Sequence, residues 1–238
     1  MGMCGRYVSA TPAQQLAEEF HVDAIKADDL PAKFNVAPTD QIYAVAISRE
    51  GMRQLGTFKW GLVPSWAKDP SIGNRMINAR AETVSSKPAF RRLLEKRRCI
   101  LPADGFYEWQ RLGSGKTQRK QPFFIRRRDG KPMALAGLWE VWKPRDDADA
   151  DWLRSATIIT GEPNELVARI HDRMPVILAE DAWDAWLDPT NNKVEDLLEL
   201  LVPYPAELME AYPVDTQVNS VQNDGPELIA PLEGHDPL

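Results

Sequence analysis

The sequence predicts an α+β fold, a single domain with a mixed, largely antiparallel, barrel-like sheet as its core and helices at the periphery. Segments of strand and helix character follow one another along the 238 residues without the regular alternation that marks a parallel βαβ sheet. Hydrophobic residues make up 43% of the chain, which suffices for one sizeable core. We therefore expect one domain over residues 3–222, with residues 1–2 as an extension and residues 223–238 as a loosely ordered tail.

The first half of the chain opens with a helix signal. Thr11 is a suitable N-cap, Pro12 takes the first helical position, and Leu16 and Phe20 follow at helical spacing, which predicts a helix over residues 12–21. The next expected elements are strands at 41–47, 53–63 and 75–83 and a short helix at 87–97.

The second half repeats this mixture of elements. A Gly- and Ser-containing segment over residues 112–120 separates two strand-like runs. The expected elements are strands at 99–111, 121–142, 155–163 and 174–178, a helical turn at 164–171, and helices at 180–187 and 193–201.

Charge is divided unevenly along the chain, although the net charge is −6. Residues 1–128 contain 22 Lys and Arg against 12 Asp and Glu, whereas residues 129–238 contain 7 against 23. The basic half is able to line a phosphate-binding face, or it is a solvated surface balanced by acidic helices, and charge alone does not separate these interpretations.

Composition also restricts the location and the cysteine chemistry. No apolar run approaches the roughly 18 residues that span a bilayer, and no secretory signal is evident, so we expect a cytoplasmic protein without a membrane partner. Two cysteines without a spacing motif argue against a disulfide framework and a zinc site. Cys99 lies in an apolar run that is typical of a buried strand, whereas Cys4 has no such surroundings.

Polar residues interrupt three segments of strand character. Asn78 and Arg80 are two residues apart, which places them on one face of a strand, and His171 and Arg173 repeat this spacing. Glu108 alternates with aromatic residues, so an apolar pocket there would raise its pKa towards that of a general acid.

Each of these residues also has a structural interpretation. Asn78 is able to complete a turn, Glu108 to pair with an arginine, and His171 to cap the preceding helix. Of the three histidines, His21 is expected to end a helix and His235 to lie in the tail. His171 is therefore the strongest acid–base candidate.

Seven motifs identify the chain as resembling a known family. They occur in one order and spacing from Met3 to about Trp186, with a weaker continuation at residues 218–219. The motifs are MCGRY, FNVAPT, WGLVPSW, NARAET, RCILPADGFYEW, AGLWE and IHDRMPVIL. In this order they resemble the SRAP family, proteins that shield abasic sites in single-stranded DNA, and the chain is similar to bacterial members.

The resemblance implies a covalent reaction at the N-terminal cysteine. In the family the initiator methionine is removed, so that the cysteine presents an α-amine and a thiol. The amine condenses with the aldehyde of a ring-opened abasic deoxyribose, and the thiol closes on the imine to give a thiazolidine. An α-amine has a pKa of about 7.7–8.0 against about 10.4 for lysine, so a useful fraction is nucleophilic at neutral pH.

The resemblance also implies a role for each matching residue. Cys4 is the expected nucleophile, Asn78 orients its amine, and Glu108 moves protons during imine formation and ring closure. His171 is expected to assist opening of the sugar ring.

DNA contacts are implied for four further residues. Arg80 and Arg173 are expected to hold the flanking phosphates, Trp66 to stack on a base beside the lesion, and Arg6 to contact DNA. Trp60 and Trp109 are expected in the core. The resemblance implies no cofactor, no metal and a monomer that joins the nucleoid when bound to single-stranded DNA.

The start of the chain departs from the family pattern, because residues 1–2 precede the MC dipeptide. Either translation begins at Met3, or the N-terminus is trimmed further to free the Cys4 amine. Two alternative functions stay open. One is a cysteine-dependent peptidase that uses Cys4, His171 and Glu108, and the other is a non-catalytic single-strand-binding module.

Overall fold

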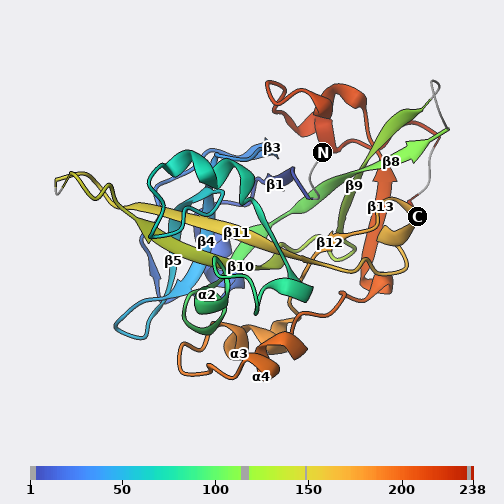
Figure 1. Ribbon diagram of the computed structural model, residues 1–238. Coiled ribbons are helices and arrows are strands. Elements are labelled where there is room, and N and C mark those ends of the chain that lie inside the picture. The colour runs from blue at the N-terminus through green and yellow to red at the C-terminus, as the bar shows by residue number, and fades with distance from the viewer. Residues whose placement is uncertain (1–3, 114–117, 148, 235–236) are drawn as a thin grey trace.

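A closed five-stranded barrel forms the centre of the computed structural model, which describes residues 4–113, 118–147, 149–234 and 237–238. Its strands are β4 (Gln41–Ile47), β5 (Arg53–Trp60), β7 (Arg98–Ala103), β10 (Met133–Trp142) and β11 (Leu153–Gly161). Adjacent strands pair antiparallel, and a parallel pairing of β5 with β11 closes the barrel. The expected α+β fold with a mixed, largely antiparallel barrel is confirmed (Figure 1).

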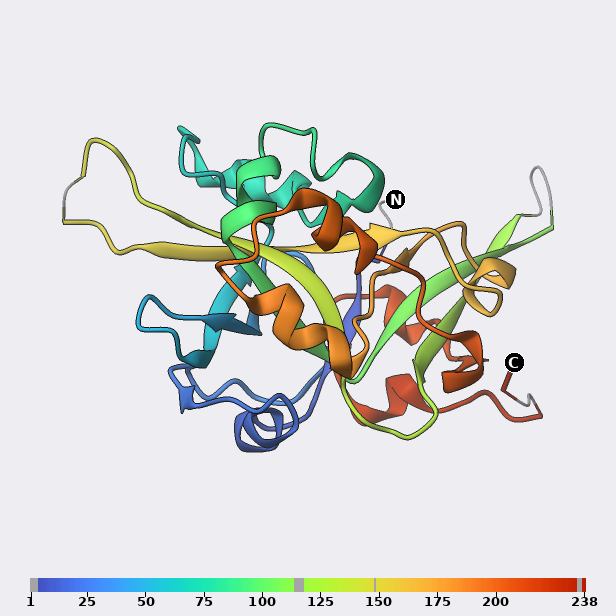
Figure 2. The same cartoon turned by 90° about the horizontal axis from the view of Figure 1, so that it is seen from below.

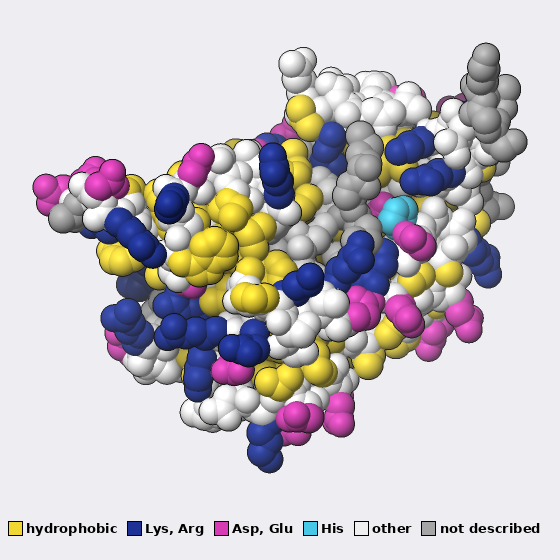
Figure 3. Space-filling model, in the orientation of Figure 1, with side chains coloured by type: hydrophobic (Ala, Val, Ile, Leu, Met, Phe, Trp, Pro, Cys, Tyr) yellow, Lys and Arg dark blue, Asp and Glu magenta, His cyan; other side chains and the backbone are white. Residues whose placement is uncertain are grey.

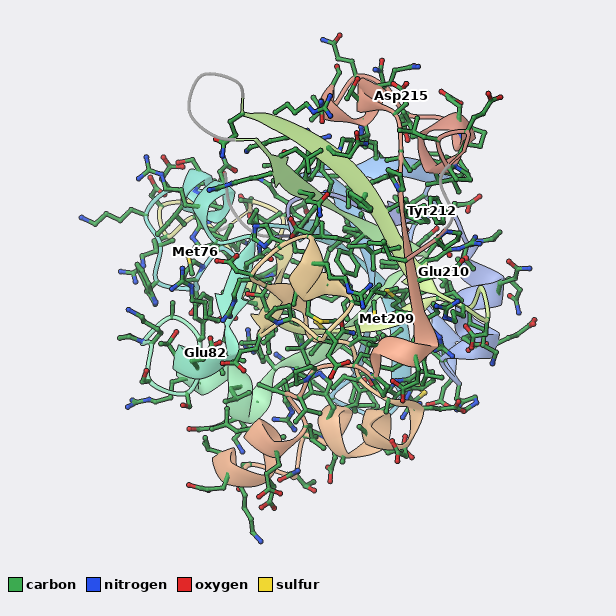
Figure 4. All side chains as sticks on the ribbon, turned by 90° about the vertical axis from the view of Figure 1, so that its right-hand side faces the viewer. Met76, Glu82, Met209, Glu210, Tyr212 and Asp215 are labelled. Carbon is green, nitrogen blue, oxygen red and sulfur yellow. The ribbon has the colours of Figure 1, made fainter. Side chains whose placement is uncertain are left out.

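A second sheet extends from one side of the barrel. Its order is β13 (Met209–Pro213), β9 (Arg119–Arg127), β8 (Gly105–Leu112), β1 (Tyr7–Ser9) and β3 (Lys33–Val36). Figure 4 shows Met209, Glu210 and Tyr212 along β13 at the outer edge of this sheet. The N-terminal segment thus becomes an interior strand between β3 and β8.

One of the places where the chain passes from the barrel to the second sheet lies between β7 and β8. Residues 99–111 were expected to form one strand, but the pairing breaks at Asp104, where β7 ends and β8 begins. The Asp104 carboxylate accepts hydrogen bonds from the backbone N–H groups of Ala10 and Thr11, at 2.5 and 3.0 Å. This contact fixes the segment after β1 against the point where the chain passes between the sheets.

Three short strands complete the sheets. They are β2 (Ala24–Ile25) beside β5, and β6 (Asn78–Arg80) and β12 (Met174–Pro175) beside β11. The expected strands at 75–83 and 174–178 are therefore present but shorter. Residues 171–173 precede β12 and are not part of a strand, so the expected strand spacing of His171 and Arg173 is wrong.

The helices are short and peripheral. They are α1 (Ala13–Glu19), α2 (Arg91–Lys96), α3 (Trp183–Leu187) and α4 (Val194–Glu199), with 3-10 turns at Pro70–Arg75, Ala81–Thr83, Val167–Arg169, Glu180–Ala182, Ala206–Leu208, Thr216–Asn219 and Pro226–Ile229. Figure 2 shows α3 and α4 covering one side of the barrel strands. In the part of the chain that the structure describes, no helix has the length and apolar character to cross a membrane.

Some of the positive charges in the basic half of the chain have a structural role, and Arg98, which follows α2, is one of them. Arg98 is 4% exposed and donates to the backbone carbonyls of Trp186 and Leu94, at 2.5 and 2.6 Å. Burial lowers the pKa of this guanidinium to about 10. Arg98 therefore anchors α2 and α3 to the barrel and does not belong to a phosphate-binding face.

The segment after residue 222 packs on the second sheet, in contrast to the expected loose tail. Leu228 is 1% exposed, and the Asp224 carboxylate accepts hydrogen bonds from the backbone N–H groups of Phe34 and Asn35. The Asn35 side chain donates to the carbonyls of Ser220 and Asn223, both at 2.9 Å. These contacts tie the C-terminal segment to β3. The expected extension at residues 1–2 lies outside the described residues, as does His235.

Candidate active site

A pocket of about 510 Å³ lies where β1, β8 and the segment before β12 meet. Three of the expected site residues line it, namely Glu108, His171 and Arg6. Its other lining residues are Gly5, Pro38, Ile77, Trp109, Arg111, Lys120, Asn219 and Val221. Figure 3 shows this face, where Lys and Arg side chains lie over β8 and β9 and continue as a broken band towards β5 and α2.

Cys4 enters the site at the base of β1. Its side chain is fully buried, and its backbone φ of 40° lies in the left-handed region that non-glycine residues rarely adopt. The Cys4 nitrogen donates a 2.7 Å hydrogen bond to Oε1 of Glu108, a contact across 104 residues of sequence. The α-nitrogen and the Glu108 carboxylate are therefore in direct contact.

Burial and a neighbouring charge control the Cys4 thiol. Removal from water raises the pKa of this thiol well above its ordinary value, and the negative charge of Glu108 raises it further. Both effects disfavour the thiolate, so the thiol is protonated at neutral pH. Cys99 is also a free, fully buried thiol, as expected, and it packs in the barrel away from this pocket.

Asn78 contacts the other end of the same residue. Its Nδ2 donates to the carbonyl oxygen of Cys4 at 3.4 Å, and it lies in β6, which pairs in parallel with β11. The structure thus places Glu108, and not Asn78, against the Cys4 nitrogen. Asn78 holds the carbonyl and thereby fixes the orientation of the Cys4 backbone.

Glu108 is a buried carboxyl at the centre of the site, with a residue exposure of 3%. Desolvation raises the pKa of Glu108, while the His171 charge and hydrogen bonds from backbone N–H groups, Cys4 among them, offset part of this effect. Its second oxygen, Oε2, lies 3.9 Å from Nε2 of His171. The carboxyl therefore lies between the Cys4 nitrogen and the imidazole.

His171 is oriented by its own neighbours in the chain. The backbone N–H of Arg173 donates to Nδ1 of the imidazole at 3.2 Å, and the Asp172 carboxylate lies 3.1 Å from the same nitrogen. When Nδ1 accepts this hydrogen bond, the neutral imidazole carries its proton on Nε2, the atom that faces Glu108. Glu108 thus contacts the Cys4 nitrogen directly, whereas the imidazole of His171 faces it from 3.9 Å, beyond hydrogen-bond distance.

The two arginines beside these residues differ in their partners. Arg173 forms a two-point ion pair with Glu82, and its Nη2 also donates to the Thr160 carbonyl at 2.7 Å. Arg80 is exposed at the end of β6, opposite Thr160 in the register with β11. Glu82 follows on the next turn, where Figure 4 labels it. The expected pair of arginines lies on one side of the site, with one member already neutralised.

Arg6 connects the pocket to the C-terminal segment. Its Nη1 donates to Oδ1 of Asn35 at 2.8 Å and to the carbonyl of Val218 at 2.9 Å. Its guanidinium lines the pocket and is held in place by these neutral oxygens. Desolvation lowers the pKa of Arg6.

Trp66 is 54% exposed and lies outside the pocket that holds Glu108. It lines a separate depression of about 360 Å³ with residues of α2, including Arg92 and Lys96. Trp60 is fully buried, as expected. Trp109 is not a core residue: it is half-buried, lines the pocket, and donates from Nε1 to Oδ1 of Asn219 at 2.7 Å.

Several pocket residues were not anticipated. Trp109 is expected in the core because aromatic residues in strands are usually buried. The sequence contains no signal that this side of the strand is accessible. Arg111 and Lys120 belong to a hairpin whose register the sequence leaves open. Among the described residues, no group of three or more His, Cys, Asp and Glu side chains is arranged to hold a metal ion.

A family model described as SOS response associated peptidase (SRAP) matches residues 3–221 of this chain. The chain belongs to the SRAP family. The SRAP match covers β1 to the turn at Thr216–Asn219, and therefore every residue of the pocket.

Relatives of this SRAP chain share a descriptive name. It is 47% identical over 229 residues to abasic site processing protein YoaM of Bacillus subtilis, covering 95% of this chain and 97% of the relative. It is 31% identical over 235 residues to abasic site processing protein YedK of Escherichia coli, covering 97% and 100%. It is 38% identical over 204 residues to abasic site processing protein HMCES of Gallus gallus, covering 76% and 58%.

A solved structure has the same SRAP architecture. A protein from Bacteroides thetaiotaomicron superimposes with a TM-score of 0.83 at 26% identity, covering 96% of this chain and all of the other. The barrel and the second sheet that carry the site are therefore shared with an experimentally determined structure.

Proposed function

We propose that this protein binds single-stranded DNA at abasic sites and crosslinks to them through Cys4, so that the lesion is shielded. The observation that carries the proposal is the 2.7 Å contact between the Cys4 nitrogen and the buried Glu108 carboxylate, at the edge of a pocket. The relatives named abasic site processing proteins support the choice of substrate.

The proposed reaction balances as a condensation. In a chain that begins at Cys4, the α-amine adds to the C1′ aldehyde of the ring-opened deoxyribose, forming a C–N bond and a carbinolamine. Loss of water gives an imine. The thiol then adds to the imine carbon, a C–S bond forms, and the thiol proton ends on nitrogen, leaving a thiazolidine and one water molecule.

Different residues of the site carry out these proton transfers. Glu108 takes a proton from the attacking nitrogen and returns one to the departing hydroxyl, because its Oε1 already contacts that nitrogen. His171, which faces the other carboxyl oxygen, exchanges protons with Glu108 and with the ring oxygen of the sugar. A thiol that stays protonated by burial does not compete with the amine for the aldehyde and delivers its proton in the last step.

The position of the site favours single-stranded DNA. The aldehyde carbon must enter a pocket between two sheets, and in continuous duplex the stacked neighbours and complementary strand oppose this movement. Removing a nucleotide from its stack costs on the order of a few kcal/mol, most of which a single strand has already lost. A monomer that acts on nucleoid DNA is sufficient for this chemistry, since one chain supplies every residue named.

A thiol peptidase is the less favoured alternative. A nucleophilic cysteine needs a lowered pKa, whereas burial and the Glu108 charge raise the pKa of the Cys4 thiol. The imidazole of His171 faces Glu108. A non-catalytic binding module would not need a buried carboxyl against the Cys4 nitrogen.

The test uses an oligonucleotide with one abasic site. Protein that begins at Cys4 should give a DNA–protein band that survives denaturing electrophoresis, with a mass equal to the two reactants less one water. Protein that retains residues 1–3 should give none, because its Cys4 nitrogen is an amide. Peptide cleavage without this band, or fully dissociable binding, would favour the peptidase or the binding module.

A matched variant separates the two bonds. Cys4→Ser in the chain that begins at residue 4 keeps the amine and removes the thiol. It should form an imine that borohydride traps but that hydrolyses without reduction. A stable band from the serine variant without borohydride would contradict the thiazolidine.

A further inference from the structure

We infer that Arg111 and Lys120, which face each other across the β8–β9 hairpin, bind a backbone phosphate of the DNA strand next to the lesion. This inference rests on the proposed function and adds a second phosphate site to it. The two side chains line the pocket that contains Glu108 and His171, and neither belongs to the arginine pair on β6 and before β12.

The register of the hairpin brings the two charges together. Arg111 lies directly opposite Lys120, within an unbroken antiparallel pairing from Phe106 to Leu112. Directly opposed residues have Cβ atoms about 4.5–5.5 Å apart, and like charges at such positions destabilise a sheet. An anion between the two cations reverses the sign of this interaction.

The surroundings of the pair favour an anion. Among the described residues that line the pocket, Glu108 is the only acidic one, and it is buried on the floor against Cys4. Arg6 is a further cation of the same pocket. A strand whose lesion sugar reaches Cys4 therefore brings its flanking phosphate into a rim of positive charge.

The hairpin pair and Arg80 lie on different elements around the site. Arg80 ends β6 beside the barrel strand β11, whereas Arg111 and Lys120 belong to the second sheet. Figure 3 shows dark-blue side chains over β8 and β9 and others over the barrel side of the same face. Contacts on both sides would fix the strand on each side of the lesion and so centre the abasic sugar over Cys4.

The hairpin also supplies a matched control. Arg119 is the neighbour of Lys120 in β9, pairs with Leu112, and is not among the described residues that line the pocket. Both residues are exposed, and replacing either by glutamine removes one positive charge. A difference between the two variants therefore reports position and not net charge.

The experiment measures binding of undamaged single-stranded oligonucleotide by fluorescence anisotropy over a series of salt concentrations. For Arg111→Gln and for Lys120→Gln, the slope of log K against log salt should fall in magnitude by about 0.7, the value for one lost phosphate contact to a single strand. Arg119→Gln should leave the slope at its wild-type value. Arg111→Lys and Lys120→Arg, which keep the charge, should also keep the slope.

Crosslinking to abasic DNA is measured in parallel, with wild type and every variant prepared as protein that begins at Cys4, and this measurement separates the two proposals. If wild-type protein crosslinks while the Arg111, Lys120 and Arg119 variants share one slope, the phosphate site is wrong and the proposed function stands. If wild-type protein fails to crosslink, the proposed function is wrong whatever the slopes show. Thermal unfolding of each variant confirms that a changed slope does not come from unfolding.

Discussion

Two glutamates lie close to the candidate site, and their surroundings shift the pKa of the carboxyl group in opposite directions. Glu108 is 3% exposed, and burial raises its pKa. The side chain of Glu82 is 45% exposed, and its hydrogen bonds with Arg173 lower its pKa. The difference shows that a carboxyl suited to proton transfer is recognised by its lack of an arginine partner, and a carboxyl that holds structure by the presence of one.

The contrast extends to what each carboxylate contacts. Glu108 accepts a hydrogen bond from the Cys4 nitrogen and faces the imidazole of His171 at 3.9 Å, the two groups that the proposed reaction uses. Glu82 contacts a guanidinium, which does not titrate in the physiological range. Glu108 is therefore placed to take part in the reaction, and Glu82 to set the charge of Arg173.

The largest effect is expected from removing the proton-accepting group. Glu108→Gln, in protein that begins at Cys4, should slow crosslinking by about 10²–10⁴-fold, the usual contribution of a positioned acid or base. Binding of undamaged strands should stay within about twofold, because the amide fills the same volume. Adduct bands quantified over time give the rate, and a near-normal rate would remove Glu108 from the mechanism.

A smaller effect should distinguish the two arginines. Arg80→Ala should weaken binding of damaged and undamaged strands alike and lower the salt slope by about 0.7. Arg173→Ala should lower the slope less, because Glu82 already neutralises that guanidinium. Equal losses from the two variants would mean that DNA displaces Glu82 completely from Arg173. Salt titrations of both variants with one oligonucleotide decide between these results.

Removing the charge of Glu82 from its ion pair with Arg173 should strengthen DNA binding, the opposite of the effect of removing either arginine. Glu82→Gln removes the carboxylate charge from the arginine and should tighten binding of single strands a few-fold at low salt, with a gain that shrinks as salt rises. The crosslinking rate at saturating protein should be unchanged. Anisotropy at two salt concentrations measures the gain, and weaker binding would show that Glu82 positions Arg173 for DNA.

The smallest effect concerns stability against pH. The raised pKa of Glu108 means that folding favours its protonated form, so wild-type stability relative to Glu108→Gln should rise as pH falls through that raised value towards the ordinary glutamate pKa of about 4.3. The lowered pKa of Glu82 means that folding favours its ionised form. Its contribution is present above the ordinary pKa and is lost as pH falls through the lowered folded value.

Thermal unfolding midpoints between pH 7 and pH 3 give the measurement for this pair. The difference between wild type and Glu108→Gln should increase towards acid, and the difference between wild type and Glu82→Gln should decrease below about pH 4.3. Parallel curves for the two variants would show that folding does not shift the pKa values of the two carboxyls in opposite directions.

The barrel was predictable because its strands carry local signals. The runs at 41–47 and 53–63 are rich in β-branched and aromatic residues, and they form β4 and β5, although β5 ends at Trp60 and not at residue 63. The second sheet was harder to predict from the sequence. The strand β1 has three residues and β13 five, and both depend on long-range pairing with β8 and β9 for their stability.

The site residues were predictable as individuals, but their arrangement was not. Motif resemblance selected Cys4, Asn78, Glu108 and His171, yet sequence alone does not say which side chain meets which atom. The expectation that Asn78 orients the Cys4 amine stays a prediction, and its printed contact in the structure is with the Cys4 carbonyl. The pairing of Arg173 with Glu82 needed a tertiary contact across 91 residues.

The backbone of Cys4 bears on the proposed requirement that the chain begin at this residue. A φ of 40° is a strained torsion for a residue with a side chain and costs of order 1–3 kcal/mol while a peptide bond precedes it. In a chain that begins at Cys4 the carbonyl carbon that defines this torsion is gone, and the strain goes with it. The proposed removal of the residues before Cys4 would therefore relieve this strain.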